Sequence, residues 1–385
     1  MMGRECLSRS YALATMVSFV FSMKTYRQLY AKIVTWENLL QASRNATQGR
    51  RFNAPVSGFN FRLESELLQL QQELADMAYR PGPYTTFMIF DPKARMISAA
   101  PFRDRVVHHA LCHIMEPVFE RTFIFNSYAN RKGKGAHRAI ERYQYYARKY
   151  RYVLKCDVRK FFPSLDHEIL KSAFRWKIQC PKTLWLSDLI LDNSNPQESV
   201  NDILKPLCLP DHCRRGLPIG NLTSQFWANV YMNRFDHFVN ETLQVPGYIR
   251  YVDDFVIFSN DKSQLASYLE EVKSYLASLR LVLHPTKTHI HHTGKGVPFL
   301  GYRVWPAYRI AKKERVRRFK RHLTAQIHQM PTDYQSLEHA LNSWLGHIRF
   351  GQARRLEYEV FWKLRSKGVN VLTHPKGSWR VLATL

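Results

Sequence analysis

The sequence predicts an α+β fold, in which a small antiparallel sheet packs against several helices. The first observation is residues 249–258, where β-branched and aromatic residues flank two adjacent acids, Asp253 and Asp254. This pattern is typical of strand, tight turn, strand. The second is residues 152–157, a short apolar run that ends in another acid, Asp157. The third is a set of segments with apolar residues at helical spacing before, between and after these strands.

Each element is expected from a local pattern. Helices are predicted where apolar residues recur every three or four positions, strands where β-branched or aromatic residues cluster, and turns at Pro and Gly. Asn221 or Thr223 is expected to cap the helix after the turn at 216–220. Phe161 and Phe162 are expected to alternate on the strand after Asp157. The remaining elements, in order, are a helix at 63–79, strands at 87–90 and 96–98 joined by a turn at 91–93, a helix at 103–120, a helical segment with a Pro- and Asn-rich loop within 171–215, and helices at 262–279, 312–322 and 337–345.

The composition indicates a polyanionic partner. The 385 residues include 57 Lys and Arg against 31 Asp and Glu, a net charge of +26. This excess is far beyond what solubility requires. A hydrophobic content of 45% excludes a mostly disordered basic tail protein. A ribosomal-type or membrane-surface protein remains an alternative on composition alone.

The six cysteines are scattered along the chain, which favours reduced thiols and a cytoplasmic protein, of a bacterium or a phage-infected cell. Cys180, Cys208, His212 and Cys213 match no standard zinc-finger spacing, so they are interpreted as a loop with incidental thiols.

The three acids indicate a particular chemistry. Two carboxylates at the tip of an apolar hairpin are costly unless water or cations reach them. Nucleotidyl transfer needs such a cluster, because two Mg²⁺ ions bridge the attacking oxygen and the leaving phosphates. Asp157, Asp253 and Asp254 are therefore the predicted ligands of two Mg²⁺ ions, with Mn²⁺ as a substitute. A turn whose acids have no function is the alternative, but it does not explain Asp157.

The order of these segments resembles the palm of a reverse transcriptase. Asp157 matches the first metal-binding aspartate of that family, residues 216–231 match its middle motif, and Asp253 and Asp254 match its YxDD box. The resemblance runs from Thr35 to Phe350. It implies a right-hand polymerase fold with fingers, a palm and a helical thumb. Further motifs are similar at 93–98 with 103–107, at 127–128 with 137–140, at 283–288 and at 299–302.

The resemblance also implies roles for single residues. Phe162 would act as the steric gate that selects deoxynucleotides, and Lys287 would lie near the leaving pyrophosphate as a catalytic residue. Gly220 would let the backbone approach the template–nucleotide pair. The nucleotide-binding set comprises Lys93, Arg95, Phe162, Ile219, Gly220 and Gln225; the primer grip comprises Phe299, Leu300, Gly301 and Tyr302.

A basic segment follows the primer-grip motif. It is expected to lie along the backbone of a nucleic-acid duplex, since a solvated charged face explains only a few of its cations. Its members are Lys312, Lys313, Arg315, Arg317, Arg318, Lys320 and Arg321.

One departure from most bacterial relatives narrows the subfamily. Ile219-Gly220 and Ser224-Gln225 stand where most relatives carry Gln-Gly and Ser-Pro. This signature resembles reverse transcriptases of diversity-generating retroelements. That resemblance implies adenine-mutagenised copying of a template-repeat RNA, with a DNA primer, dNTPs and a small basic accessory protein as partners and no membrane. The alternatives are a retron-like or phage-defence reverse transcriptase and, in another class, an inactive RNA-binding scaffold.

The resemblance divides the chain into parts. The expected parts are an N-terminal extension (1–34), mainly fingers (35–150), mainly palm with an insertion near 171–215 (151–302), and a basic helical thumb with a short tail (303–385). Within the extension, residues 1–22 contain an apolar run and are expected to be a mis-called start or disordered. The tail is too short for an RNase H, maturase or endonuclease domain.

Overall fold

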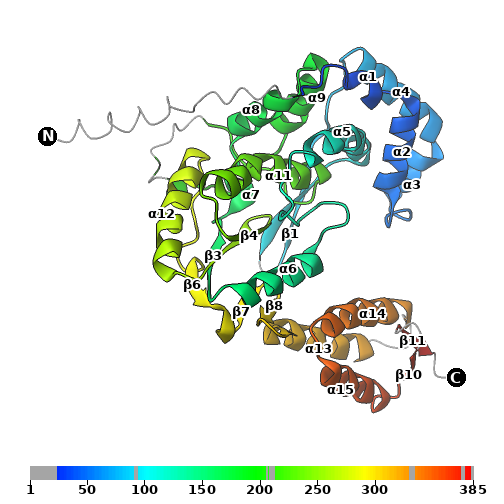
Figure 1. Cartoon of the computed structure of the whole chain (residues 1–385). Helices are drawn as coiled ribbons and strands as arrows, with labels where there is room; N and C mark the ends of the chain where they lie inside the picture. Colours follow the sequence, from blue (N-terminus) through cyan, green and yellow to red (C-terminus); the bar gives the residue numbers. More distant parts are fainter. Residues whose placement is uncertain are drawn as a thin grey trace.

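Alternating side chains give the central sheet two buried faces. In the computed structural model, which describes residues 24–90, 94–204, 207, 213–328, 334–373 and 378–382, four antiparallel strands pair in the order β4-β5-β3-β6. These are β3 (Tyr152–Asp157), β4 (Gly247–Tyr251), β5 (Asp254–Ser259) and β6 (His289–His292). β4 and β5 are buried along almost their whole length, because helices and a second sheet cover the two faces (Figure 1).

Different elements cover each face of this sheet. Leu154 and Ile257 lie in one core with α11 (Leu222–His237) and α12 (Lys262–Ser278). Val153 and Phe258 lie in another core with α6 (Ala136–Lys149), where the rings of Tyr143 and Phe258 are 5.0 Å apart. The alternation of strand side chains thus buries both faces of the sheet.

The N-terminal part is helical with one exposed hairpin. α2 (Trp36–Thr47) packs along α5 (Phe102–Glu120), and α5 in turn packs on α11. The antiparallel hairpin of β1 (Thr85–Ile89) and β2 (Arg95–Ala99) projects from this part, and β1 is exposed at every residue. The other helices here are α1 (Tyr30–Ile33), α3 (Ala54–Phe61) and α4 (Leu63–Ala75).

Short elements connect β3 with α11, and α11 with β4. They are α7 (Phe161–Ser164), α8 (His167–Lys177), α9 (Pro181–Asp192), α10 (Asn201–Leu204) and the π-helix η3 (Phe238–Thr242). The 3-10 turn η4 (Thr293–Lys295) follows β6.

The C-terminal part has its own core. A three-stranded sheet of β7 (Val297–Phe299), β8 (Tyr302–Val304) and β9 (Arg309–Ala311) leads into α13 (Lys313–His328), α14 (Tyr334–Phe350) and α15 (Arg354–Arg365). The helices enclose a core with the hairpin of β10 (Asn370–Thr373) and β11 (Trp379–Leu382). They lie beside the three-stranded sheet, apart from the N-terminal helices (Figure 1). Within the described ranges, no helix is long and apolar enough to cross a membrane.

The mixed architecture confirms the α+β prediction, and most expected elements are present within a few residues. One strand prediction was wrong: Phe161 and Phe162 lie on the short helix α7. The positive φ of Lys160 (43°) ends the extended path, and Pro163 fits the first turn of a helix. Asn221 is at the N-cap position of α11, but its side chain does not cap the helix; its amide donates to the Tyr84 hydroxyl at 3.2 Å. The helical segment expected from residue 171 contains the end of α8 and all of α9. Residues 1–22, Lys93, Cys208 and His212 lie outside the described residues.

Candidate active site

Strand register brings the three predicted acids to one end of the central sheet. Asp157 is the last residue of β3 and is directly opposite Asp254, the first residue of β5. Asp253 lies in the two-residue turn between β4 and β5, and its carbonyl accepts a hydrogen bond from Val158 N at 3.1 Å. Asp157 and Asp254 each expose 18% of their side chains. Solvent-borne ligands can therefore reach both carboxylates.

The turn that carries Asp253 is strained. Val252, its first residue, has a φ of 58°, which is rare for a β-branched residue. Its carbonyl accepts a hydrogen bond from Arg250 Nη1 at 3.1 Å. Arg250 is fully buried and pairs with Asp236 of α11 at 2.7 Å. A buried ion pair thus supports the turn from below, which fixes the position of Asp253.

Two lysines face the acids. Lys287 Nζ lies 2.5 Å from Asp157 Oδ2, and Lys155 Nζ lies 3.6 Å from Asp254 Oδ2. Burial and the charge of Asp157 raise the pKa of Asp253 to about 6. Burial raises the pKa of Asp254 to about 7; Lys155 opposes this shift, whereas Asp253 and Asp157 add to it. Burial and mutual repulsion thus oppose ionisation of Asp253 and Asp254 when no cation is bound.

The donor chemistry of these acids fits a divalent cation. Carboxylate oxygens are the ligands that Mg²⁺ prefers, and Asp254 Oδ1 is buried without a hydrogen-bond partner among the described residues. As placed, no three His, Cys, Asp or Glu side chains in the described part of the chain are close enough to hold a metal ion. Lys287 pairs with Asp157 and Lys155 pairs with Asp254. These carboxylate side chains would therefore have to rotate to coordinate a bound cation.

The β1–β2 hairpin contributes a further cation near the acids. Arg95, the exposed first residue of β2, lowers the pKa of Asp253, so its charge lies near the acids. The hairpin is fixed to the turn before α11 by a 3.0 Å hydrogen bond from Ser98 N to Ile219 O. Gly220 has a φ of 116°, and a Cβ there would lie 3.1 Å from Ile97 Cγ2. Glycine therefore permits this close approach.

Phe162 and Gln225 differ in their relation to the acids. Phe162 is half-buried beside the fully packed Phe161, and its carbonyl accepts from Leu217 N at 2.9 Å. Of the two phenylalanines, Phe162 is the one with an accessible ring. Gln225 is exposed on α11 and lines a pocket toward α2 and α5. It is not brought against the acids by any contact in the described structure.

The predicted primer-grip residues form a β-turn on the second sheet. Phe299 and Tyr302 are buried, at 0% and 1% exposure, while Leu300 and Gly301 form the turn with φ of 45° and 90°. Only the turn is available to a ligand; the two aromatic rings anchor it. The backbone N–H of Lys312 donates to Gly301 O at 3.1 Å, which ties the basic segment to this turn.

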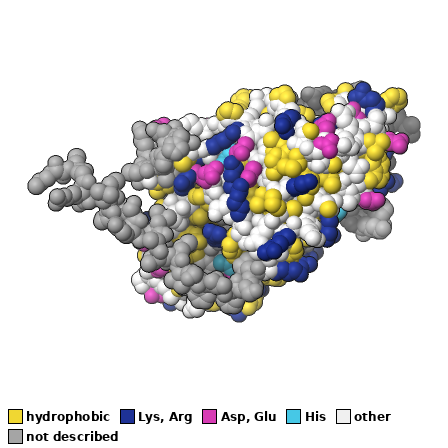
Figure 2. Space-filling view, turned by 90° about the horizontal axis from the view of Figure 1, so that it is seen from above, with side chains coloured by type: hydrophobic (Ala, Val, Ile, Leu, Met, Phe, Trp, Pro, Cys, Tyr) yellow, Lys and Arg dark blue, Asp and Glu magenta, His cyan; other side chains and the backbone are white. Residues whose placement is uncertain are grey.

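The basic segment forms α13, apart from Lys312, which precedes it. Its exposed cations are Lys313, Arg315, Arg317 and Arg321, whereas Arg318 and Lys320 are half-buried. Lys320 pairs with Glu359 of α15 at 2.9 Å. Elsewhere, basic, acidic and hydrophobic side chains are interspersed on the face in Figure 2. The net charge is thus not confined to one patch on that face.

Lys155, Arg250 and Asp236 were missed by the sequence interpretation. Lys155 precedes Asp157 by two positions on one strand, so both point to the same face; that spacing was a usable signal. Arg250 was detectable as a charged residue inside an apolar strand. Asp236 gave no signal, because only the fold brings α11 beneath β4.

The chain is similar to known proteins over more than half of its length. A family model described as "Reverse transcriptase (RNA-dependent DNA polymerase)" matches residues 90–304, a range that contains all three acids and Lys287. Protein YkfC of Escherichia coli (strain K12) is 27% identical over 339 residues, which are 76% of this chain and 86% of YkfC. Group II intron-encoded protein LtrA of Lactococcus lactis subsp. cremoris is 21% identical over 345 residues, which are 70% of this chain and 54% of LtrA. The match thus spans about half of LtrA.

Proposed function

Because the chain belongs to the reverse transcriptase (RNA-dependent DNA polymerase) family, whose model matches more than half of it, we propose that it copies a template-repeat RNA into adenine-mutagenised cDNA for a diversity-generating retroelement. The family assignment makes the protein an RNA-directed DNA polymerase, an enzyme that binds template RNA, a primer and dNTPs. We propose, in addition, that it acts in a retroelement, that it works with an accessory protein, and that single residues have the roles described below.

The architecture supports assigning the parts of a right hand. The four-stranded sheet with α11 and α12 would be the palm, and the N-terminal helices with the β1–β2 hairpin would be the fingers. The C-terminal helices would be the thumb, because they form a separate core that connects to the palm through the three-stranded sheet.

Asp157, Asp253 and Asp254 would hold two Mg²⁺ ions. The metal would neutralise charge on the attacking and leaving oxygens as the primer 3′-OH joins the α-phosphate of the nucleotide. A bound cation would offset the burial and the mutual repulsion that raise the pKa of Asp253 and of Asp254, which supports this assignment. Lys287, at 2.5 Å from Asp157, would turn toward the departing pyrophosphate. Positioning and charge neutralisation would thus supply most of the catalysis.

Residues of the hairpin and of α7 would hold the nucleotide. Arg95 would bind the triphosphate through its guanidinium fork, because its charge already reaches Asp253. Phe162 would exclude the ribose 2′-OH with its accessible ring. Lys93 remains a proposed triphosphate contact outside the described residues.

Ile219 carries the assignment to a diversity-generating retroelement. Its carbonyl accepts a hydrogen bond from Ser98 N of β2, and the family resemblance would place its side chain beside the nascent base pair. Glutamine, which stands here in most relatives, can hydrogen-bond that pair, whereas isoleucine offers only dispersion contact. Losing one net hydrogen bond lowers selectivity by roughly two- to tenfold. That raises errors but does not single out adenine, so the accessory protein or weak pairing would have to add the bias.

Primer extension on a defined RNA template tests the polymerase assignment. Asp253→Asn should abolish extension while leaving RNA binding within a few-fold, because binding depends on the basic surface. Extension at the wild-type rate by this variant would contradict the role of Asp253.

Sequencing the cDNA tests the retroelement assignment. Wild-type cDNA should carry substitutions concentrated opposite template adenines, and Ile219→Gln should reduce them without abolishing extension. An error spectrum without adenine bias, with or without the accessory protein, would favour a retron-like or phage-defence enzyme. A template repeat paired with an adenine-variable repeat beside the gene would support the proposal independently.

A further inference from the structure

The side chain of Asn221 contacts a distant element instead of capping its own helix. Asn221 occupies the N-cap position of α11 and is 4% exposed, but its side chain accepts no hydrogen bond from the backbone of that helix. An asparagine at this position usually stabilises a helix by accepting such a bond. Here its amide donates to the hydroxyl of Tyr84, 137 positions away in the chain, at 3.2 Å. The contact joins the start of α11 to the segment that enters the β1–β2 hairpin.

Tyr84 itself is held close to a buried carboxylate. Asp104 of α5 is 3% exposed, and it accepts hydrogen bonds from the Tyr79 hydroxyl at 2.6 Å and from Gly82 N at 2.8 Å. Burial raises the pKa of Tyr84 to about 12; the charge of Asp104 adds to this shift, and the hydrogen bond from Asn221 opposes it. The Tyr84 hydroxyl is therefore neutral, and the chain just before β1 is fixed to α5.

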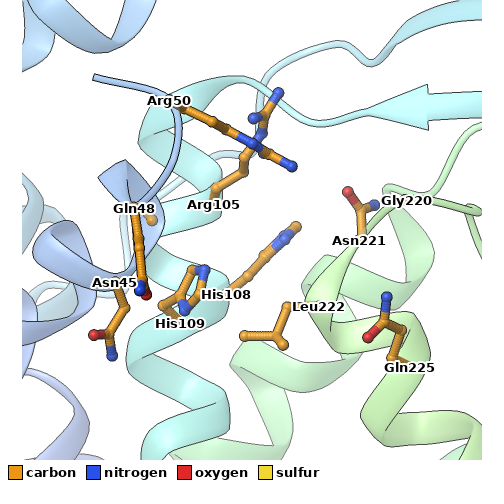
Figure 3. Close-up of a pocket in the computed structure, with 11 residues that line it drawn as sticks. Asn45, Gln48, Arg50, Arg105, His108, His109, Gly220, Asn221, Leu222 and Gln225 are labelled. Atoms are coloured by element: carbon orange, nitrogen blue, oxygen red, sulfur yellow. The ribbon is translucent and has the colours of Figure 1, made fainter. Parts of the chain in front are cut away.

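The turn before α11 is joined to the hairpin at a second point. Ser98 N donates to Ile219 O at 3.0 Å. Among the described residues, only Ile97 Cγ2 and Ser98 O would lie within 4 Å of a Cβ at Gly220. Gly220 and Asn221 also line a pocket of about 210 Å³, whose other walls include α2 and α5 (Figure 3). This hollow leaves the turn without close packing from that side, so its position depends on the hairpin.

The two contacts connect the two sides of the proposed nucleotide site. Arg95 lies on the hairpin, whereas Ile219 and Gly220 lie on the turn. The Ser98–Ile219 bond joins two backbone groups and is therefore open to any sequence, but the Tyr84–Asn221 bond requires these two side chains. A shift of the hairpin against the turn would change the spacing between the triphosphate contact and the base-pair contact.

We infer that Tyr84 and Asn221 are positioning residues for the incoming nucleotide. Their hydrogen bond holds the turn against the hairpin, so the two sides of the nucleotide site keep a fixed spacing. Neither side chain has to touch the nucleotide. The inference rests on the proposed function, because it concerns how the polymerase site is held together. Losing the bond should weaken nucleotide binding without removing any group from the chemistry.

Two substitutions break the bond from opposite ends. Tyr84→Phe removes only the hydroxyl. Asn221→Ser removes the amide but places a preferred N-cap residue at the start of α11, so thermal stability should be retained. Each should raise the KM for dNTP roughly two- to tenfold, the usual worth of one hydrogen bond. The kcat should stay within about twofold, because an interaction common to ground state and transition state is lost. Single-nucleotide primer extension gives both constants.

A primer without a 3′-OH separates nucleotide binding from chemistry. The labelled enzyme–primer–template complex would be titrated with the next complementary dNTP. The affinity for dNTP should fall in each variant by the factor by which KM rises, while affinity for the primer–template alone stays unchanged. The double variant should match the larger single effect, because both substitutions break the same bond.

Tyr30→Phe is the matched control. The Tyr30 hydroxyl donates to Leu74 O at 2.5 Å, which joins α1 to α4 without involving the hairpin or the turn. This substitution also removes a tyrosine hydroxyl bond from the N-terminal part, so thermal stability should fall. The KM for dNTP should remain at the wild-type value.

The outcomes distinguish this inference from the proposed function. An unchanged KM in Asn221→Ser, or a rise in Tyr30→Phe as large as that in Tyr84→Phe, would overturn the positioning role. Additive effects in the double variant would overturn it as well, because the two side chains would then act separately. Wild-type extension with unchanged variants contradicts the inference alone. Failure of wild type to bind dNTP and to extend the primer contradicts the polymerase assignment, and the inference with it.

Discussion

The buried carboxylate of Asp254 lowers the stability of the folded protein at neutral and high pH. Burial raises its pKa to about 7, whereas an aspartate in an unfolded chain has a pKa of about 3.9. The folded state therefore binds the proton more tightly, so ionising Asp254 above pH 7 destabilises the fold. That cost is relieved as the pH falls from 7 toward 4. Among the described residues, its buried Oδ1 has no hydrogen-bond partner, and this also destabilises the ionised carboxylate.

Asp254→Asn should accordingly stabilise the metal-free protein. At pH 8 in EDTA we expect a gain of roughly 1–3 kcal/mol, the usual cost of an unsatisfied buried polar group. The gain should disappear near pH 4, where the wild-type carboxyl is protonated. Urea unfolding at both pH values measures it, and a variant that is less stable at pH 8 would contradict the raised pKa.

Phe162 is the residue on which sugar selection should depend. Its ring is half-buried, whereas Phe161 beside it is packed in the core. Phe162→Ala should raise ribonucleotide incorporation relative to deoxynucleotide, because the ring no longer fills the space of the 2′-OH. Competition between rNTP and dNTP in primer extension gives the ratio.

Phe161→Leu is the matched control for this prediction. It should lower stability by a few kcal/mol, as expected when a core ring is truncated, and leave sugar selection unchanged. If the control rather than Phe162→Ala relaxes selection, the gate is Phe161.

At the scale of elements, α13 is expected to contact the nucleic-acid backbone. Arg317 and Arg321 are exposed one turn apart, and neither has an ion-pair partner in the described part of the chain. Replacing both with Ala should reduce the salt slope for binding a primer–template duplex by roughly 1–2, given about 0.9 per phosphate contact on a DNA duplex.

Arg354→Ala with Arg355→Ala is the control for α13. Both arginines are exposed on the neighbouring helix α15, so the same charge is removed from a different face. Equal reductions in the two double variants would mean that total charge, and not α13, sets the salt slope.

The central β-hairpin was predictable from the sequence, but the buried ion pair beneath its turn was not. The β-branched and aromatic residues at 249–258 predict two strands and a turn, and the structure has β4 and β5 there. The fully buried Arg250–Asp236 pair beneath the turn joins β4 to α11. No local pattern reports a contact between elements that tertiary packing creates. Breaking such a pair typically costs about 3–5 kcal/mol.

At the scale of the whole molecule, the strands that carry the acids and several of the longer helices followed from sequence patterns, and so did the places of Asp157 at a strand end and of Asp253 in the hairpin turn. The pocket beside α11 did not, because its walls come from residues 45–50, 105–109 and 220–225. The short helix at Phe161 was missed because a positive φ at Lys160, a residue that rarely adopts one, interrupts an otherwise strand-like run. Local sequence thus reports periodicity well, but not long-range contacts or unusual backbone angles.

The C-terminal helices connect to the rest through few contacts. Tyr302 of β8 hydrogen-bonds His347 of α14, donating to its carbonyl at 2.9 Å, and His137 of α6 stacks on Phe350 at 3.8 Å. Their own core is separate from the two cores around the sheet. The proposed thumb is therefore a unit whose stability depends mainly on its own side chains.

The strained backbone at Val252 also reduces the number of destabilising substitutions that the folded protein can tolerate. A β-branched residue at a φ of 58° costs of order 1–3 kcal/mol, a large fraction of the 5–15 kcal/mol that keeps a typical protein folded. Each destabilising substitution elsewhere adds to that deficit. Lineages of this chain should consequently accept fewer neutral changes in the core around the hairpin than at the exposed helices, and random mutagenesis should recover more survivors once Val252 is replaced by a residue that tolerates positive φ.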